Sequence, residues 1–148
     1  MLVARRTAIS VYEGDDPLIT LTIMMVGANG VLVPFDFTGA LVEFFQKANS
    51  ESSDPLVATY STAGANAITI LPAPPYDLNG NPLTGTTTNR ITIQMDRSAL
   101  LVAGILFYFI RTTKSLKRQT VLSGPLEIVP TGTSVPVPPA VAFGFGGY

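Results

Sequence analysis

Strict alternation of apolar and polar side chains is the feature that most constrains the fold of this chain. In residues 18–25, threonines alternate with three apolar side chains, Ile19, Leu21 and Ile23. Residues 90–95 alternate in the same way. A period of two places every second side chain on the same face of a strand, whereas a helix needs a period of 3.6. Both segments are therefore predicted to be half-buried strands.

Short apolar segments separated by turn residues continue this pattern along the chain. The further strands that we predict are residues 8–12, 31–33, 41–47, 56–60, 67–71, 106–113 and 118–129. The last two should form a hairpin around Lys114–Lys117. Asp96 should cap one helical turn, because an aspartate side chain accepts hydrogen bonds from the free amides there. Many short strands at close spacing indicate an all-β chain folded as an antiparallel β-sandwich.

Four turn signals occur in a defined order between these strands. They are Val11–Asp16, Pro34–Ala40, Gly104 at the start of an aromatic strand, and Ser123-Gly124 within the last strand. In that order they resemble the small immunoglobulin-like domain of bacteriophage virion proteins, especially the N-terminal domain of upper-baseplate and tail-fibre adaptor proteins. The resemblance covers roughly residues 7–130. It implies an immunoglobulin-like antiparallel sandwich in a virion protein that assembles in the host cytoplasm.

The composition removes most catalytic chemistry. The chain has no histidine and no cysteine, so it lacks the common near-neutral acid-base group, the thiol nucleophile and the usual zinc ligands. Nine basic residues nearly balance ten acidic ones, which leaves no field that would gather a polyanion. We expect a protein that is not an enzyme, that holds no metal or cofactor, and that does not bind nucleic acid.

Charge is scarce on this chain. Charged residues make up 13% of it, whereas about 25% is typical of a soluble domain. Because a soluble monomer needs a charged surface to stay apart from its copies, we expect a homo-oligomer whose subunits cover much of one another's surface. A membrane protein is the alternative explanation. The longest apolar run, Ala99–Ile110, has 12 residues, fewer than the roughly 18 to 20 that span a bilayer, so no membrane span is expected.

Residues 7–130 are expected to form the sandwich, and residues 1–6 an N-terminal extension. Two further segments do not fit a minimal sandwich. Residues 72–89 contain four prolines, and we predict an inserted loop there, because proline cannot donate to a strand ladder. Residues 131–148 begin with a proline-rich stretch and end in three aromatic residues, Phe143, Phe145 and Tyr148. We expect an extended C-terminal arm outside the sheets, with its aromatic end on an adjacent subunit.

Three polar motifs have weak chemical readings. Asp77–Asn81 carries oxygen ligands at alternate positions, as at the start of a calcium loop, but Pro82 stands where that loop requires glycine. A turn around Asn79-Gly80 is the favoured interpretation, and a looser calcium site is the alternative. Asp15-Asp16 resembles a pair of catalytic carboxylates, but such a pair needs its second carboxylate held across a cleft. Lys114, Lys117 and Arg118 are interpreted as a solvated basic hairpin tip.

Aromatic side chains on the outer faces of two predicted strands suggest an interface. The resemblance places Val42, Phe44, Leu106, Tyr108 and Ile110 inward. It leaves Phe45, Phe107 and Phe109 outward on neighbouring strands, so these rings should form one exposed patch. We expect another subunit to cover the patch, and cover by the inserted loop or the arm is the alternative. The predicted interface residues are thus Phe45, Phe107, Phe109, Phe143, Phe145 and Tyr148.

Three functional classes follow from these observations. The favoured one is a structural component of a bacteriophage particle, in the tail, baseplate, neck or capsid decoration, that docks to other virion proteins. The alternative is a carbohydrate-binding or adhesive immunoglobulin-like module for host attachment, although the chain has no tryptophan to stack on a sugar. A hydrolase is the third class, and it would need a pair of catalytic acids that the sequence does not display.

Overall fold

The computed structural model describes residues 2–3, 5–6, 9–48, 56–63, 67–130 and 140–145. The strands in these ranges are β1 (Leu2–Val3), β2 (Arg5–Arg6), β3 (Ile9–Tyr12), β4 (Leu18–Val26), β5 (Leu32–Pro34), β6 (Leu41–Lys47), β7 (Leu56–Ser61), β8 (Ile68–Ile70), β9 (Arg90–Gln94), β10 (Gly104–Lys114), β11 (Lys117–Val129) and β12 (Ala140–Phe145). One turn of 3-10 helix, η1 (Arg97–Ala99), is the only helical element within them. The predicted all-β class is confirmed.

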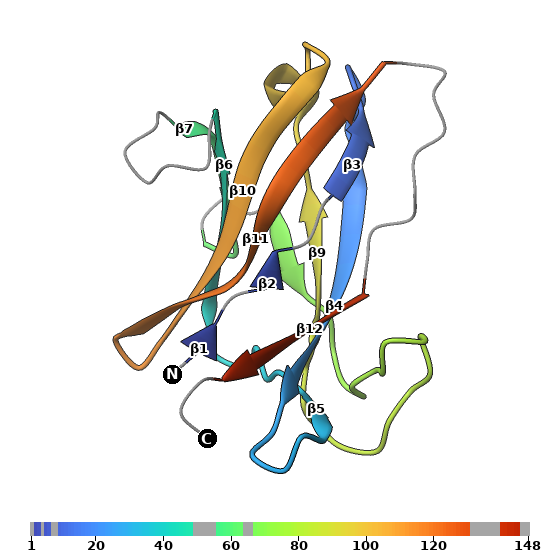
Figure 1. The fold of residues 1–148 in the computed structure, drawn as a ribbon, viewed down its shortest axis with the longest axis vertical. Helices are drawn as coiled ribbons and strands as arrows, with labels where there is room; N and C mark the ends of the chain where they lie inside the picture. Colours follow the sequence, from blue (N-terminus) through green and yellow to red (C-terminus); the bar gives the residue numbers. More distant parts are fainter. Residues whose placement is uncertain are drawn as a thin grey trace.

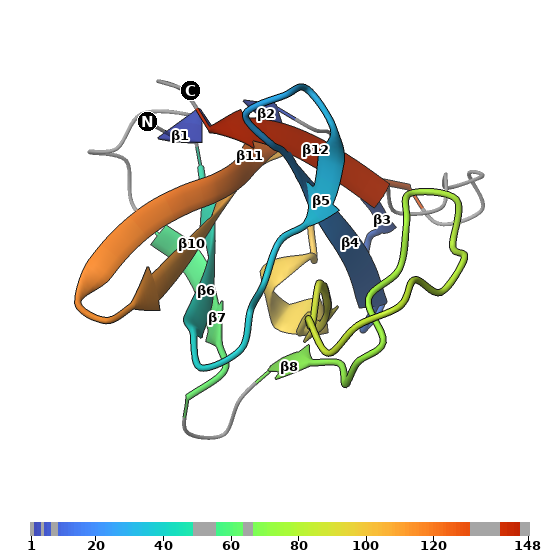
Figure 2. The same cartoon turned by 90° about the horizontal axis from the view of Figure 1, so that it is seen from below.

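The strands form two sheets (Figure 1). The first has the order β1-β12-β4-β9-β8, with β5 also paired to β4, and the second has the order β2-β11-β10-β6-β7, with β3 also paired to β11. Figure 2 shows β10, β6 and β7 on one side of the molecule and β4 and β5 on the other. Apolar side chains from both sheets meet between these layers in one core cluster.

The alternation in the sequence accounts for the central strands of the first sheet. Ile19, Leu21 and Ile23 of β4 are buried, as are Ile91 and Ile93 of the adjacent β9. The two strands pair antiparallel, with Ile19 opposite Ile93 and Leu21 opposite Ile91. One apolar face of each strand thus packs into the core, as predicted.

The inward face of the second sheet is also as predicted. Val42, Phe44, Tyr108 and Ile110 are buried, and Leu106 is partly buried against the core. The Phe44 and Tyr108 rings stack in parallel planes with their centroids 5.2 Å apart. Offset stacking of this kind adds to the free energy gained from burial.

Three strand pairs correct the expectation of an antiparallel sandwich. β2 and β3 both run parallel to β11, and β12 runs parallel to β4. Strands joined by short turns are antiparallel neighbours, whereas these pairs join segments that lie far apart in the chain. The sheets are therefore mixed, because the N-terminal and C-terminal segments add to strands that the local turn signals do not specify.

The predicted arm outside the sheets is wrong for residues 140–145. These residues form β12, which pairs with β4 over Thr22–Val26 and with β1 over Leu2–Val3. The physical reason is that no proline follows Pro139, so this stretch keeps the backbone amides that a ladder needs. β5 and β9 pair along one edge of β4, and β12 occupies the other.

The prolines of residues 72–89 coincide with the loop that connects β8 to β9. Its regular backbone pairing is one isolated bridge between Tyr76 and Pro82. Asn89, which is 1% exposed, holds the loop to the first sheet. Its Nδ2 donates to the carbonyl oxygens of Tyr76 (2.7 Å) and Ile23 (3.3 Å), and its Oδ1 accepts from the Tyr76 amide (2.9 Å).

Candidate functional site

The outer face of the second sheet brings together three of the predicted interface residues, Phe45, Phe107 and Phe109, here called the outer aromatic row. β10 pairs with β6 so that Phe109 lies opposite Phe45 and Phe107 lies opposite Lys47. The Phe45 and Phe109 rings stack with centroids 4.7 Å apart. The predicted convergence of these side chains on one face is thus present.

Charged neighbours cover part of the outer aromatic row. The Arg111 guanidinium lies 4.7 Å from the centroid of the Phe45 ring and makes a 3.1 Å ion pair with Glu43. Lys47 Nζ lies 5.9 Å from the centroid of the Phe109 ring. Cations are attracted to the faces of aromatic rings, so the Arg111 and Lys47 side chains lie over part of the outer aromatic row.

The expected exposure of Phe45 is therefore wrong, since 8% of this residue is accessible. β6 lies between β7 and β10, so side chains from neighbouring strands flank the ring on its own face. Phe107 and Phe109 are half-buried and form the accessible part of the row. Side chains in residues 131–148 are not described, so the roles predicted for Phe143, Phe145 and Tyr148 stay predictions.

Large apolar side chains are also exposed elsewhere on the described surface. They are Leu18, Val31, Leu32, Leu41, Leu56, Val57, Leu101, Val102, Ile105 and Leu116. Ile105 precedes Phe107 by two residues on β10, so it extends the outer aromatic row along the same face. Single exposed apolar residues are ordinary on protein surfaces.

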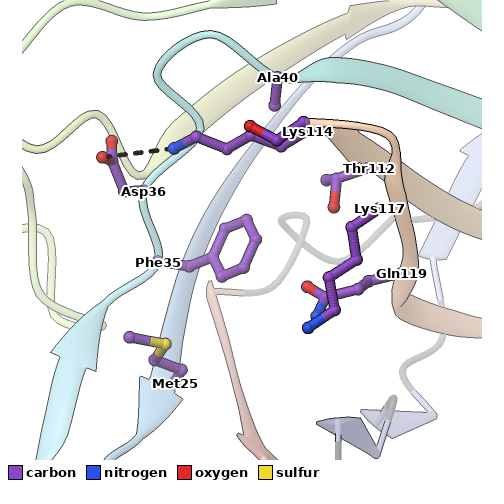
Figure 3. Close-up of a pocket in the computed structure, with 9 residues that line it drawn as sticks. Met25, Phe35, Asp36, Ala40, Thr112, Lys114, Lys117 and Gln119 are labelled. Carbon is purple, nitrogen blue, oxygen red and sulfur yellow. Dashed lines mark ion pairs between the residues drawn. The ribbon is translucent and has the colours of Figure 1, made fainter.

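A pocket of about 380 Å³ opens between the β10–β11 hairpin and the segment around β5 (Figure 3). Its lining residues are Met25, Phe35, Asp36, Ala40, Thr112, Lys114, Ser115, Lys117 and Gln119. Small-molecule sites in proteins span about 300 to 1,000 Å³, so this pocket is at the lower end of that range. It has an apolar floor and a rim of polar side chains.

The pocket arises because the inner face of β10 changes character along the strand. Tyr108 and Ile110 fill the core, but the next two residues on that face are Thr112 and Lys114. Apolar packing therefore stops before the hairpin tip. The sequence interpretation missed this site, although the change from apolar to polar residues at a period of two was the signal for it.

One carboxylate at the pocket rim is held ionised. Asp36 Oδ1 accepts hydrogen bonds from the Thr38 hydroxyl (2.7 Å) and amide (3.1 Å), and Oδ2 lies 3.9 Å from Lys114 Nζ. Partial burial acts to raise the pKa of Asp36, but the bonds from Thr38, the Thr88 amide and the charge of Lys114 outweigh it and lower that pKa. Asp36 thus offsets one of the two lysine charges at the rim.

The acidic motifs of the sequence have structural roles in the fold. Asp16 accepts bonds from the Arg97 guanidinium (2.6 and 2.9 Å) and amide (2.8 Å), so it faces a cation and not a second acid. Asp96 accepts from the Ser98 amide (2.8 Å) and caps η1, as predicted.

The Asp77–Asn81 segment is a turn. Asp77 Oδ1 accepts from the amides of Asn79 and Asn81, each at 2.9 Å, which matches the favoured interpretation. Within the described ranges, no group of three or more His, Cys, Asp or Glu side chains is arranged to hold a metal ion. In the same ranges, no helix has the length and apolarity needed to cross a bilayer.

We expect the free energy of unfolding to be nearly constant between about pH 5 and about pH 9, because histidine and cysteine are absent. Bonds from the Arg97 side chain and from the Ser98 and Asn81 amides lower the pKa of Asp16, Asp96 and Asp77, respectively. Their contribution is complete above the ordinary value of 3.8 and is lost as the pH falls through the lower folded value.

At alkaline pH the unfolding free energy changes in the opposite direction, because it falls as the pH rises. Burial raises the pKa of Tyr108, so its hydroxyl stays neutral in the folded state after it would ionise in the unfolded chain, and stability falls above about pH 10. Urea denaturation at a series of pH values measures both limits. A steep change in unfolding free energy between pH 6 and pH 8 would contradict this expectation.

Comparison with known proteins gives no assignment. No family model and no curated protein matches the chain. Among solved structures, the chain is similar to part of a family 123 glycoside hydrolase from Clostridium perfringens, with a TM-score of 0.28 and 15% sequence identity. The match covers 84% of this chain and 23% of the hydrolase chain. A similarity at this level carries no argument about function.

Proposed function

We propose that this chain is an immunoglobulin-like structural subunit of a bacteriophage particle that docks to other virion proteins and to its own copies. The observation that carries the docking proposal is the outer face of β10. Phe107 and Phe109 are half-buried there and Ile105 is exposed, on the broad face of a sheet. Burial of apolar surface contributes about 25 cal/mol per Å², so these side chains favour a covered state.

The order of the strands supports the immunoglobulin-like part of the proposal. β4, β9 and β8 lie side by side like strands B, E and D of an immunoglobulin sandwich. β11, β10, β6 and β7 have the order of strands G, F, C and C′ in the opposite sheet. The virion assignment itself rests on the turn motifs of the sequence, and the particle position stays open among tail, baseplate, neck and capsid surface.

The low charge of the chain supports assembly with other subunits over a monomeric state in solution. Charged residues make up 13% of the chain, and several charges within the described ranges are engaged internally, in Arg97–Asp16, Arg111–Glu43 and Lys114–Asp36. Few charges are then left to keep copies apart. We propose a binding role without catalysis, since the carboxylates Asp16, Asp77 and Asp96 serve local structure.

Replacing Phe107 and Phe109 together by Asp tests the docking proposal. We expect a folded protein whose self-association or incorporation into particles is weakened more than tenfold. Full burial of a Phe contributes about 1.5 to 3 kcal/mol, and each of these half-buried rings would gain roughly half of that on association. Sedimentation velocity and particle incorporation measure the effect. Leu116→Asp is the matched control, since Leu116 is 99% exposed at the hairpin tip and away from this face.

Two results would overturn the docking proposal. One is a monomeric unmodified chain at every concentration tested and with its particle partners present. The other is equal loss of association in the Leu116→Asp control, which would show a general effect of added charge. Far-ultraviolet circular dichroism of both variants separates a docking defect from unfolding.

A further inference from the structure

We propose that the pocket beneath the β10–β11 hairpin is a binding site for a carboxylate carried on a short apolar body. The site is separate from the outer aromatic row, because it opens on the inner face of the second sheet. The proposal therefore does not depend on the virion role. Three properties of the pocket lead to this ligand class.

The first property is an apolar floor. Phe35 forms it together with Met25 of β4 and Ala40, which precedes β6 (Figure 3). Met25 and Ala40 are only partly buried and pack against the edge of the core. A short hydrocarbon group would cover these side chains and continue the core toward the hairpin tip.

The second property is a threonine hydroxyl that faces the pocket. Thr112 is 4% exposed, and Figure 3 shows its side chain directed from β10 into the pocket. A threonine hydroxyl that lines a pocket can donate a hydrogen bond to a ligand oxygen.

The third property is an excess positive charge at the rim. Lys114 is 3.9 Å from the ionised Asp36. Lys117 lines the same pocket, and within the described ranges it has no ion-pair partner. Two ammonium groups and one carboxylate leave one positive charge, which favours an anion. A carboxylate could accept from Lys117 and from Thr112 while its apolar body covers Phe35.

Two sources could supply this chemistry, a free fatty acid or the C-terminal apolar residue of a polypeptide. Hexanoate and N-acetyl-leucine are the respective probes. Hexanol and N-acetyl-leucine amide keep the apolar body and lack the charge, and acetate keeps the charge and lacks the body. The methyl resonances of Met25 and Ala40 in the full chain report binding at the pocket floor.

We expect hexanoate, N-acetyl-leucine or both to shift these resonances, with hexanol, the amide and acetate at least tenfold weaker. Lys117→Gln should weaken binding about threefold to tenfold, because it removes an exposed charge-assisted bond. Thr112→Val should weaken it by a similar factor. Arg118→Gln is the matched control, since Arg118 is exposed on the same hairpin but does not line the pocket.

The response to the two probes identifies the source. Binding of hexanoate alone indicates a free acid, and binding of N-acetyl-leucine indicates a polypeptide C-terminus. The proposal is overturned if neither probe binds more tightly than about 10 mM, if hexanol binds as well as hexanoate, or if Lys117→Gln has no greater effect than Arg118→Gln. Lys117 is exposed, so its substitution tests the charge without disturbing the core.

Discussion

A chain that ends at Pro130 should lose about 3 to 5 kcal/mol of unfolding free energy, or fail to fold. Removal of residues 131–148 takes away β12, which pairs with five residues of β4, Thr22–Val26. A backbone hydrogen bond contributes about 1 kcal/mol net, and small domains are stable by about 5 to 15 kcal/mol. The loss would also leave one edge of a central strand open to water and to other chains.

Urea denaturation of the truncated chain measures this effect, and a chain that ends at Phe145 is its control. The control keeps β12 and should retain nearly all of the stability. An unchanged unfolding free energy in the shorter chain would contradict the pairing of β12 with β4. It would restore the expectation from sequence that this segment lies outside the sheets.

Asn89→Leu should lower the unfolding free energy by about 2 to 4 kcal/mol. The side chain of Asn89 bonds to both the amide and the carbonyl of Tyr76 and to the carbonyl of Ile23. Leucine is similar in size but cannot replace these bonds, and each buried group left unpaired costs about 1 to 3 kcal/mol. Because the same bonds fix the 71–89 loop, protection of the Tyr76 amide against hydrogen exchange should fall as well.

Asn79→Leu is the control for this prediction, because Asn79 is exposed in the same loop. We expect a change of no more than about 0.5 kcal/mol there. If Asn89→Leu and Asn79→Leu have the same unfolding free energy, Asn89 does not anchor the loop. If Asn89→Leu loses stability while Tyr76 keeps its protection, the cost arises in the core and not in the attachment of the loop.

Local patterns in the sequence predicted the central strands well. Residues 18–25 and 41–47 were placed within one residue of β4 and β6, and their inward side chains were correct. The reason is that a period of two leaves a strand one apolar face, and burial of that face selects its orientation. The four prolines of residues 72–89 predicted a loop for an equally local reason, because they lack amide donors.

The candidate sites depended on contacts that no local pattern contains. Phe45 was predicted outward, and it is, but Arg111 and Phe109 come from another strand and cover it. The pocket likewise requires Thr112 of β10 to face Phe35, and the two residues lie far apart in the chain. Side-chain periodicity predicts which face a residue takes, whereas its neighbours on that face depend on strand order and register.

By itself, then, the sequence determined an all-β chain, the inward faces of its main strands, the capped turn at Asp96 and the loop of residues 72–89. These features follow from alternation, capping chemistry and missing amide donors, all of which act over a few residues. The tertiary structure alone decided that β12 joins β4, that β3 joins β11 and that Asn89 is buried. Those outcomes depend on which backbone edges and polar groups are left unpaired once the two sheets have packed, and they are settled between segments distant in the chain.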